Sequence, residues 1–169
     1  PDGGYLYTTS CIDRNLETSS SLDRFYHLLG RHEDRANEFY VEYQQSEKSL
    51  TDQPIKFMSH ITSKILKSID YEKIALVRKR NFDYIRTRLE TKLPDNFESE
   101  HFVPMTFPYF TKDRALGKTL IDSDIYIAKY WRDAISRANV LELSLIENYI
   151  HLPIDQRVRT EDIDRFLNL

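Results

Sequence analysis

Glycine and cysteine are scarce in this chain, and each scarcity excludes a class of chemistry. The 169 residues include four glycines and one cysteine. A P-loop or a dinucleotide-binding turn needs several glycines at fixed spacing, and only Gly30 and Gly117 follow the pair at the start. We therefore expect no phosphate-binding loop of these types. Cys11 alone cannot form an internal disulfide, which is typical of a cytoplasmic protein.

Long apolar runs and a charge of one sign are also missing. The longest apolar run, near residues 125–128, is far shorter than the roughly 20 residues of a transmembrane helix, and no signal peptide is recognised. The 24 basic and 27 acidic side chains are mixed along the chain. We expect no membrane and no nucleic-acid partner, although a basic stripe over residues 78–88 keeps a nucleic-acid adaptor as the weakest hypothesis.

The candidates for a metal site or a nucleophile are weak. His27, His32 and Glu33 lie close in sequence, but the two histidines are five residues apart and would point to different sides of a helix. His60, His101 and His151 are scattered singly and are interpreted as surface or hydrogen-bonded structural residues. No Gly-x-Ser-x-Gly motif occurs. We predict no metal site and no self-contained catalytic residue.

Apolar residues at helical spacing predict helices through the first half of the chain. One predicted helix covers residues 22–43 with a break near Gly30, and a second covers residues 55–69 after Pro54. Asp70 is the expected N-cap of a third helix, which Pro94 closes. The opening "PDGGYLYTT" predicts a turn followed by a short strand over residues 5–8.

The second half alternates between short strands and helices. Pro104 and Pro108 interrupt "HFVPMTFPYFT" and favour an edge strand or a bulge. The other predicted elements are a helix over 113–121, a strand "IYIA" over 125–128, a helix over 139–147, a strand "YIHLPI" and a helix capped by Thr160. The pattern predicts an α/β (α+β) fold, with long helices followed by a small antiparallel sheet packed with helices. We divide it into residues 1–20, 21–93 and 94–169.

Four segments together resemble a known family. They are "FMSHITSKILKSIDYEKIALVRKRNFDYIRTRLE", "FVPMTFPYF", "IYIAKYW" and "ENYIHLPIDQRVRTEDIDRFL". In their order and separation they resemble the C-terminal part of DegT/DnrJ-type aminotransferases, the fold-type I pyridoxal-phosphate enzymes that aminate keto-sugars attached to nucleotides. The likeness covers most of residues 54–169. It implies that the α+β unit is the small C-terminal domain of such an enzyme.

The same resemblance gives a meaning to the opening glycine pair. In such enzymes a Gly-Gly pair and the last strand of the large domain follow the lysine that binds the cofactor, and "PDGGYLYTT" resembles that pair and strand. The resemblance therefore implies that the lysine and the large domain precede Pro1, with residues 1–20 as the end of that domain and a linker. Pyridoxal phosphate and a small-molecule substrate are implied for the intact parent. No catalytic lysine and no bound cofactor are expected for this chain alone.

The resemblance also implies cofactor-side residues. Gly3 and Gly4 would lie near the cofactor. Relatives carry an asparagine just before the Met segment, from which the neighbouring subunit reaches the cofactor phosphate, but "DQPIKFMS" has none. Gln53 or Ser59 could replace that donor, or the contact could be lost.

Three further residues are candidates for the substrate side. Tyr130 and Trp131 would face the substrate, where their rings suit stacking or hydrogen bonding to a sugar or a nucleotide, with a core or lobe-interface role as the alternative. Arg157 would bind a carboxylate or a phosphate, with a structural pair to Asp155 as the favoured alternative.

Two functions stay open at this point. The first is the C-terminal region of a pyridoxal-phosphate-dependent aminotransferase-like protein, catalytically incomplete as this chain. The alternative is a stand-alone protein-interaction module that keeps the small-lobe fold without catalysis. The helices after residue 20 would rest on the large domain, so their uncovered apolar side predicts a homodimer or other self-association.

Overall fold

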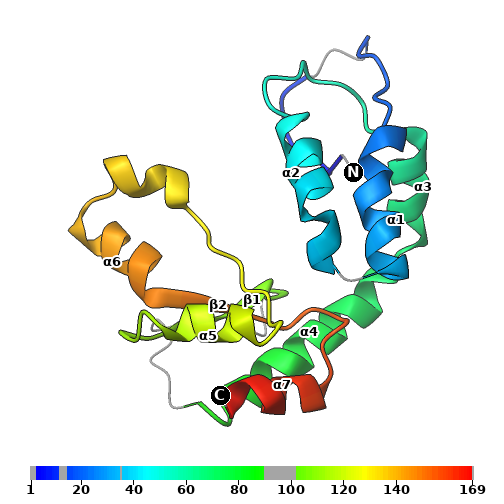
Figure 1. Cartoon of the computed structure of the whole chain (residues 1–169). Helices are drawn as coiled ribbons and strands as arrows, with labels where there is room; N and C mark the ends of the chain where they lie inside the picture. The colour runs from blue at the N-terminus through cyan, green and yellow to red at the C-terminus, as the bar shows by residue number, and fades with distance from the viewer. Residues whose placement is uncertain (1–2, 12–14, 35, 90–101, 169) are drawn as a thin grey trace. The chain divides into compact units, whose positions relative to one another are not determined.

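The computed structural model describes residues 3–11, 15–34, 36–89 and 102–168 (Figure 1). The chain divides into two compact units, Pro1–Ile69 and Asp70–Leu169. Helices and one two-stranded antiparallel sheet make up the regular structure of the described residues, as expected for an α+β fold. The division falls between Ile69 and Asp70; of the boundaries expected from the sequence, residue 93 lies outside the described residues.

The first unit is built from short helices. They are η1 (Leu22–Phe25), α1 (Tyr26–Glu33), η2 (Ala36–Phe39), α2 (Tyr40–Lys48) and α3 (His60–Ser68). The predicted break near Gly30 is wrong, because α1 continues through Gly30 and ends before Asp34. Gly30 instead gives room to the ring of Phe39, which a Cβ atom at that position would overlap.

Two other predictions for this unit are wrong. Residues 5–8 form no strand, because no described segment supplies them with a ladder partner. The helix predicted over 55–69 begins only at His60. Phe57 is extended instead: its N–H donates to the Glu17 carbonyl over 2.8 Å, and its carbonyl accepts from Ser19 N–H over 2.8 Å. The helix then starts at its own N-cap, Ser59, whose hydroxyl accepts from the Thr62 N–H.

The first unit buries polar rather than apolar side chains. Its buried residues, among those described, are Ser21, His27, Ser46, Ser59 and Thr62. Large apolar side chains of the same helices stay open to solvent, including Tyr26, Leu29, Tyr40, Val41 and Ile65. Buried polar groups beside exposed apolar ones are the reverse of the usual arrangement. This unit therefore has no apolar core of its own in the described residues.

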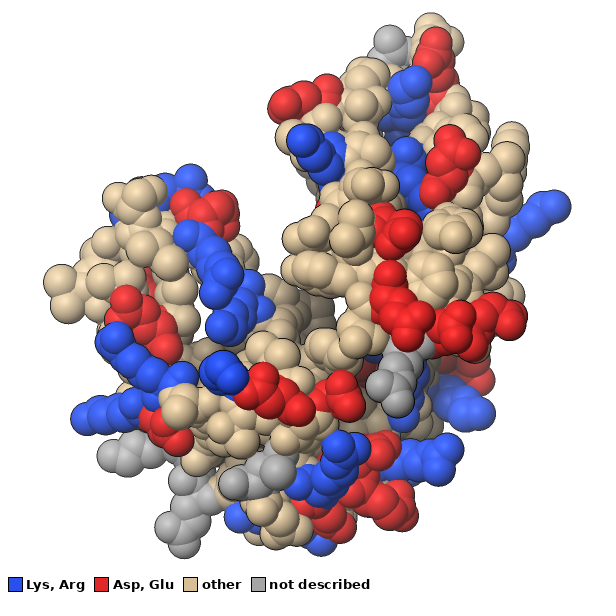
Figure 2. Space-filling model, viewed as in Figure 1, with Lys and Arg blue, Asp and Glu red and all other residues tan. Residues whose placement is uncertain are grey.

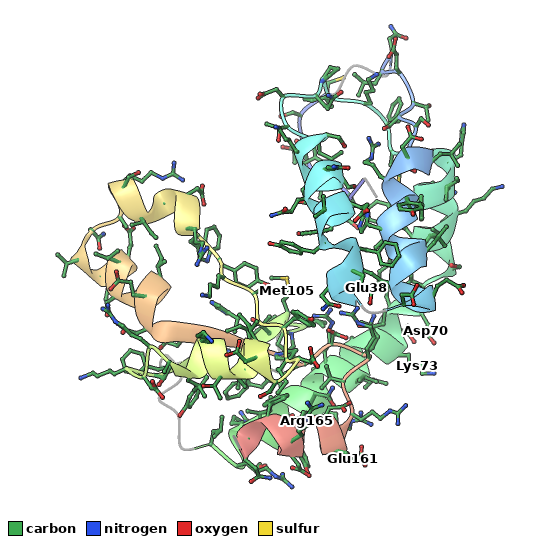
Figure 3. The ribbon with its side chains drawn as sticks, in the orientation of Figure 1. Glu38, Asp70, Lys73, Met105, Glu161 and Arg165 are labelled. Atoms are coloured by element: carbon green, nitrogen blue, oxygen red, sulfur yellow. The ribbon has the colours of Figure 1, made fainter. Side chains whose placement is uncertain are left out.

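The second unit carries the sheet. Its elements are α4 (Tyr71–Arg86), β1 (Thr106–Phe110), α5 (Leu116–Asp122), η4 (Arg132–Arg137), α6 (Val140–Asn148), β2 (Tyr149–Pro153) and α7 (Thr160–Leu167). β1 and β2 pair antiparallel, with Phe107 opposite Leu152 and Pro108 opposite His151. The predicted cap of α4 is confirmed, since the Asp70 carboxylate accepts from the Lys73 N–H over 2.9 Å (Figure 3).

Some predicted boundaries in this unit need correction. The strand expected over residues 125–128 is reduced to one bridge, between Ala128 and His151, because Asp124 before it and Trp131 after it adopt left-handed conformations that turn the chain. α4 ends at Arg86, and Pro94 lies outside the described residues. Thr160 is the first residue of α7 rather than its cap. The N–H of the preceding Arg159 donates to the Asp162 carboxylate instead.

A compact apolar core joins the helices to the sheet within the second unit. Its buried members are Phe82, Ile85, Phe107, Leu120, Ile125, Leu152, Ile154, Ile163 and Phe166. The rings of Phe82 on α4 and Phe107 on β1 lie 4.8 Å apart between centroids. This core fixes the sheet against α4 and α7, so the outer part of the unit is built on a rigid base.

Candidate functional site

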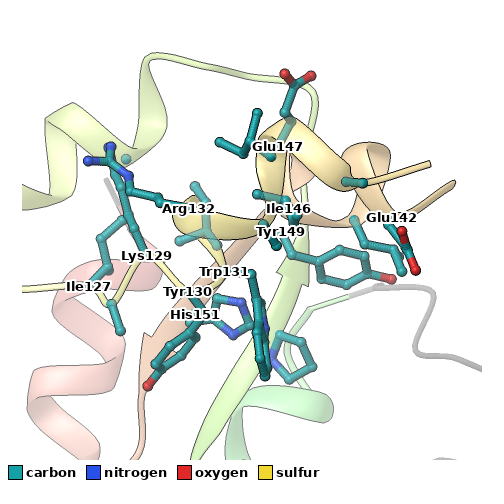
Figure 4. Close-up of a pocket in the computed structure, with 18 of the residues that line it drawn as sticks. Ile127, Lys129, Tyr130, Trp131, Arg132, Glu142, Ile146, Glu147, Tyr149 and His151 are labelled. Carbon is teal, nitrogen blue, oxygen red and sulfur yellow. The ribbon is translucent and has the colours of Figure 1, made fainter. Parts of the chain in front are cut away.

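A cavity of about 850 Å³ lies within the second unit (Figure 4). Its walls come from the strands β1 and β2, from α5, from residues 127–132 and from η4 and α6. Cavities of 300–1,000 Å³ are the usual size for small-molecule sites. Tyr130 and Trp131, predicted on the substrate side, both line it. Arg157, the third of that group, does not.

Trp131 is held in an unusual backbone conformation at the edge of this cavity. Its φ is 62° and its ψ is 21°, in the left-handed region, and its side chain is 69% exposed. A bulky residue in this region costs roughly 1–3 kcal/mol, and such residues persist where the surroundings impose them. The conformation lets the chain turn from Tyr130 into η4 while the indole stays at the cavity wall.

His151 forms the floor of the cavity beside Tyr130. Its Nδ1 lies 3.2 Å from the hydroxyl of Thr106, across the β1–β2 pair, and its ring meets that of Tyr130 edge to face at 4.7 Å between centroids. Figure 4 shows the rings of Tyr130, Trp131 and His151 grouped together. Burial lowers the pKa of His151 below its ordinary value, so the imidazole is neutral at pH 7. The sequence indicated a hydrogen-bonded histidine here, but no pattern in it predicted a place in a cavity.

The acidic side chains around the cavity already have structural partners. Glu142 accepts from the Asn139 N–H, Asp113 accepts from the Ala115 N–H, and Glu147 lies 3.7 Å from Arg114. Two cations of the wall, Lys129 and Arg132, make no hydrogen bond or ion pair with any residue that the structure describes. Across the view in Figure 2, acidic and basic side chains are intermixed.

Arg157 is engaged elsewhere. Its guanidinium forms two hydrogen bonds with the Asp155 carboxylate, Nε to Oδ1 over 2.9 Å and Nη2 to Oδ2 over 3.0 Å. These bonds hold the pKa of Asp155 below its ordinary value, despite the burial that opposes the shift. The structural pair, which the sequence favoured over anion binding, is present.

The predicted cofactor-side residues separate into two groups. Gly3 and Gly4 line a smaller hollow of about 310 Å³ in the first unit, together with Gln53. Gly3 has a φ of 90°, and a Cβ there would lie 2.7 Å from the Cβ of Met58. Ser59 does not line the hollow. It is buried, with its hydroxyl 2.5 Å from that of Ser21, where it caps α3.

Other site types find no support in the described residues. No group of three His, Cys, Asp or Glu side chains is placed to hold a metal ion there, and the thiol of Cys11 is exposed. None of the described helices combines the length and the apolar character needed to cross a bilayer.

Comparison of the chain with protein-family models, with curated proteins and with solved structures finds no match.

Proposed function

We propose that this chain is the C-terminal region of a pyridoxal-phosphate-dependent, DegT/DnrJ-like aminotransferase and is catalytically incomplete by itself. The observation that carries the proposal is the joining of its motif segments around one helix. The Nδ2 of Asn81 on α4 lies 3.0–3.3 Å from three carbonyl oxygens of the "LPIDQRV" segment, those of Ile154, Asp155 and Val158. One turn earlier, Arg78 donates to the carbonyl of Met105 in "FVPMTFPYF" over 2.9 Å.

These bonds connect the first segment of the resemblance, which contains Arg78 and Asn81, to two of its other segments. Arg78 is 27 residues from Met105 and Asn81 is 73 residues from Ile154 in sequence, so the bonds are not local contacts. Hydrogen bonds that bring these segments together in space support the resemblance more strongly than the order of the segments along the chain does. The position of Gly3 against Met58, with Gln53 in the same hollow, gives further support for the expected cofactor side.

The coding sequence upstream of Pro1 tests this proposal. We expect an open reading frame that encodes a cofactor-binding domain with a lysine shortly before Pro1. A start codon with a ribosome-binding site directly at Pro1 would contradict it and would favour the stand-alone module.

A second test uses the protein itself. Reduction with borohydride in the presence of pyridoxal phosphate should attach a pyridoxyl group to that upstream lysine of the extended protein. The same treatment of residues 1–169 should leave all ten lysines without a stoichiometric adduct, because a solvated ammonium group is a poor nucleophile. Peptide mass spectrometry locates the adduct. A stoichiometric adduct on any one lysine of this chain would contradict the proposal.

A second candidate function is self-association through the first unit. It is favoured by the absence of a buried apolar side chain there among the described residues, while Tyr26, Leu29 and Val41 are each more than half exposed. Uncovered apolar surface of this kind is characteristic of protein–protein contacts. Sedimentation over a range of concentrations should detect a homodimer or a larger species. A compact monomer at the highest concentration would contradict self-association, and Leu29→Lys should weaken it if α1 contributes.

A further inference from the structure

We propose that the cavity of the second unit binds a small molecule with a planar aromatic ring and one phosphate or carboxylate group. The residues that carry this inference are Trp131 for the ring and Lys129 and Arg132 for the anion. Only the identification of this ligand with the substrate of the intact enzyme rests on the proposed function. The binding itself requires nothing outside the second unit.

The aromatic half of the inference rests on Trp131. Indole carries a large apolar surface, yet Trp131 is 69% exposed, and its backbone is in the left-handed conformation. Strain at one residue beside a cavity is typical of a preorganised binding group. Tyr130 and His151 supply two more rings on the same wall, at 4.7 Å from each other. A planar ring can therefore stack on the indole and contact the edge of this pair.

The anionic half rests on the charges of the same wall. Asp113, Glu142 and Glu147 are satisfied by backbone N–H groups or by Arg114. Lys129 and Arg132 flank the two aromatic residues directly in sequence, line the cavity, and have no partner in the part of the chain that the structure describes. Charge-assisted hydrogen bonds from such cations to phosphate or carboxylate are the strongest of the common polar contacts.

Trp131 is the only tryptophan of the chain, so its fluorescence reports on this cavity alone. Residues 1–169 are titrated with phenyl phosphate and, in a second arm, with phenylacetate, which separates a phosphate from a carboxylate preference. Saturable quenching or a spectral shift with at least one of them is expected. Inorganic phosphate and phenol, each half of the ligand, should bind at least tenfold more weakly, because each lacks one of the two contacts. Added salt should weaken the binding.

Lysine variants provide the matched comparison. Lys129→Met removes one cation of the wall and should weaken binding about tenfold, as expected for the loss of one charge-assisted hydrogen bond. Lys112→Met removes another exposed lysine of the same unit that does not line the cavity, and binding should not change. Circular dichroism and the unfolding midpoint show that each variant is folded.

Three results would overturn the inference. They are the absence of saturable change in Trp131 fluorescence with either aryl anion, equal affinity for phenol, and equal affinities of Lys129→Met and Lys112→Met. If Lys129→Met fails to fold, the comparison of phenyl phosphate with phenol in the unmodified chain still decides. Failure here leaves the upstream-lysine tests of the aminotransferase proposal unaffected, and failure of those tests leaves the binding measurements unaffected.

Discussion

Single side chains join distant segments of the second unit, and Asn81 is the clearest example. Asn81 has no exposed surface, and its amide nitrogen is the donor to carbonyls of the segment that follows β2. Its Oδ1 accepts from the guanidinium of the adjacent Arg80 over 3.2 Å. A buried amide with both ends satisfied fixes one arrangement of the chain, because any displacement leaves several polar groups without a partner.

Replacement of Asn81 by alanine should be strongly destabilising. We expect Asn81→Ala to lower the free energy of unfolding by about 3 kcal/mol, since it leaves buried carbonyl oxygens unsatisfied and opens a cavity. Denaturation by urea measures the change. Asn168→Ala is the matched control: it removes an exposed amide that donates to the Asp164 carbonyl, and we expect a loss below about 1 kcal/mol. Equal losses of unfolding free energy for the two variants would show that the hydrogen bonds of Asn81 do not stabilise the fold.

Gly30 gives a second prediction at this scale. Alanine is the better helix former by about 1 kcal/mol, so Gly30→Ala in the middle of α1 would stabilise an isolated helix. In the folded chain the added methyl group would overlap the ring of Phe39, and we expect a net loss of stability. Thermal unfolding measures it. Gly117→Ala in α5 is the control, because its Cβ would lie 3.4 Å from Ile127, an ordinary contact. A gain in stability for Gly30→Ala would contradict the close contact between Gly30 and the ring of Phe39.

At the scale of helices and strands, predictions from a few neighbouring residues held more often than those that depend on distant partners, although the cap expected at Thr160 lies one residue earlier, at Arg159. Asp70 caps α4, a helix lies close to the predicted range 139–147, and "YIHLP" forms β2, all as the sequence indicates. These features depend on a few neighbouring residues. The strand expected over 125–128 and the early start of α3 were wrong, because they depend on tertiary partners: His151 for the first and Glu17 and Ser19 for the second.

The candidate site was predictable only in part for the same reason. Aromatic residues at 130 and 131 could be selected from the sequence because of their chemistry. The positive φ of Trp131, the placement of His151 beside Tyr130, and the lack of partners for Lys129 and Arg132 are properties of the folded unit. The pair of Arg157 with Asp155 could be expected from the sequence, because the two residues are only two positions apart, but its hydrogen bonds are seen only in the folded unit.

The cap of α4 offers a prediction for a whole element. The Asp70 carboxylate accepts from the N–H of Lys73 and places negative charge at the positive end of a 16-residue helix. Asp70→Ala should lower the free energy of unfolding by about 1 kcal/mol. Asp70→Asn keeps the acceptor without the charge and should cost no more than about half of that. The urea midpoints of both variants provide the test, and a neutral Asp70→Ala would contradict the role of the cap.

For the molecule as a whole, several titrating groups act on stability in the same direction at low pH. The Lys56 ammonium lowers the pKa of Glu17, and the Arg157 guanidinium lowers that of Asp155. Burial lowers the pKa values of His27 and His151. Each of these groups binds protons more readily in the unfolded chain than in the folded one. The free energy of unfolding therefore rises with pH wherever they titrate.

Two tyrosines lower the stability of the fold at high pH. Burial raises the pKa values of Tyr43 and Tyr84 above the ordinary 10, with a hydrogen bond to Asp164 as a further cause for Tyr84. Their folded forms hold the proton more firmly than the unfolded chain does. Their contribution is complete below pH 10 and is lost as the pH rises through their folded pKa values. Stability should thus be greatest between these limits and should fall on both sides.

The loss of stability at low pH can be assigned to the histidines or to Asp155 by substitution. The histidine contribution is complete above a pH of about 6.5 and is lost as the pH falls through the folded pKa values, whereas the Asp155 contribution is lost only below about pH 4. Urea denaturation across this range should therefore show two successive declines. His27→Gln with His151→Gln should flatten the first decline, and Arg157→Met should reduce the second. His60→Gln, at an exposed position, controls for the replacement of a histidine as such. A first decline that persists in the double histidine variant would mean that other groups destabilise the fold in acid.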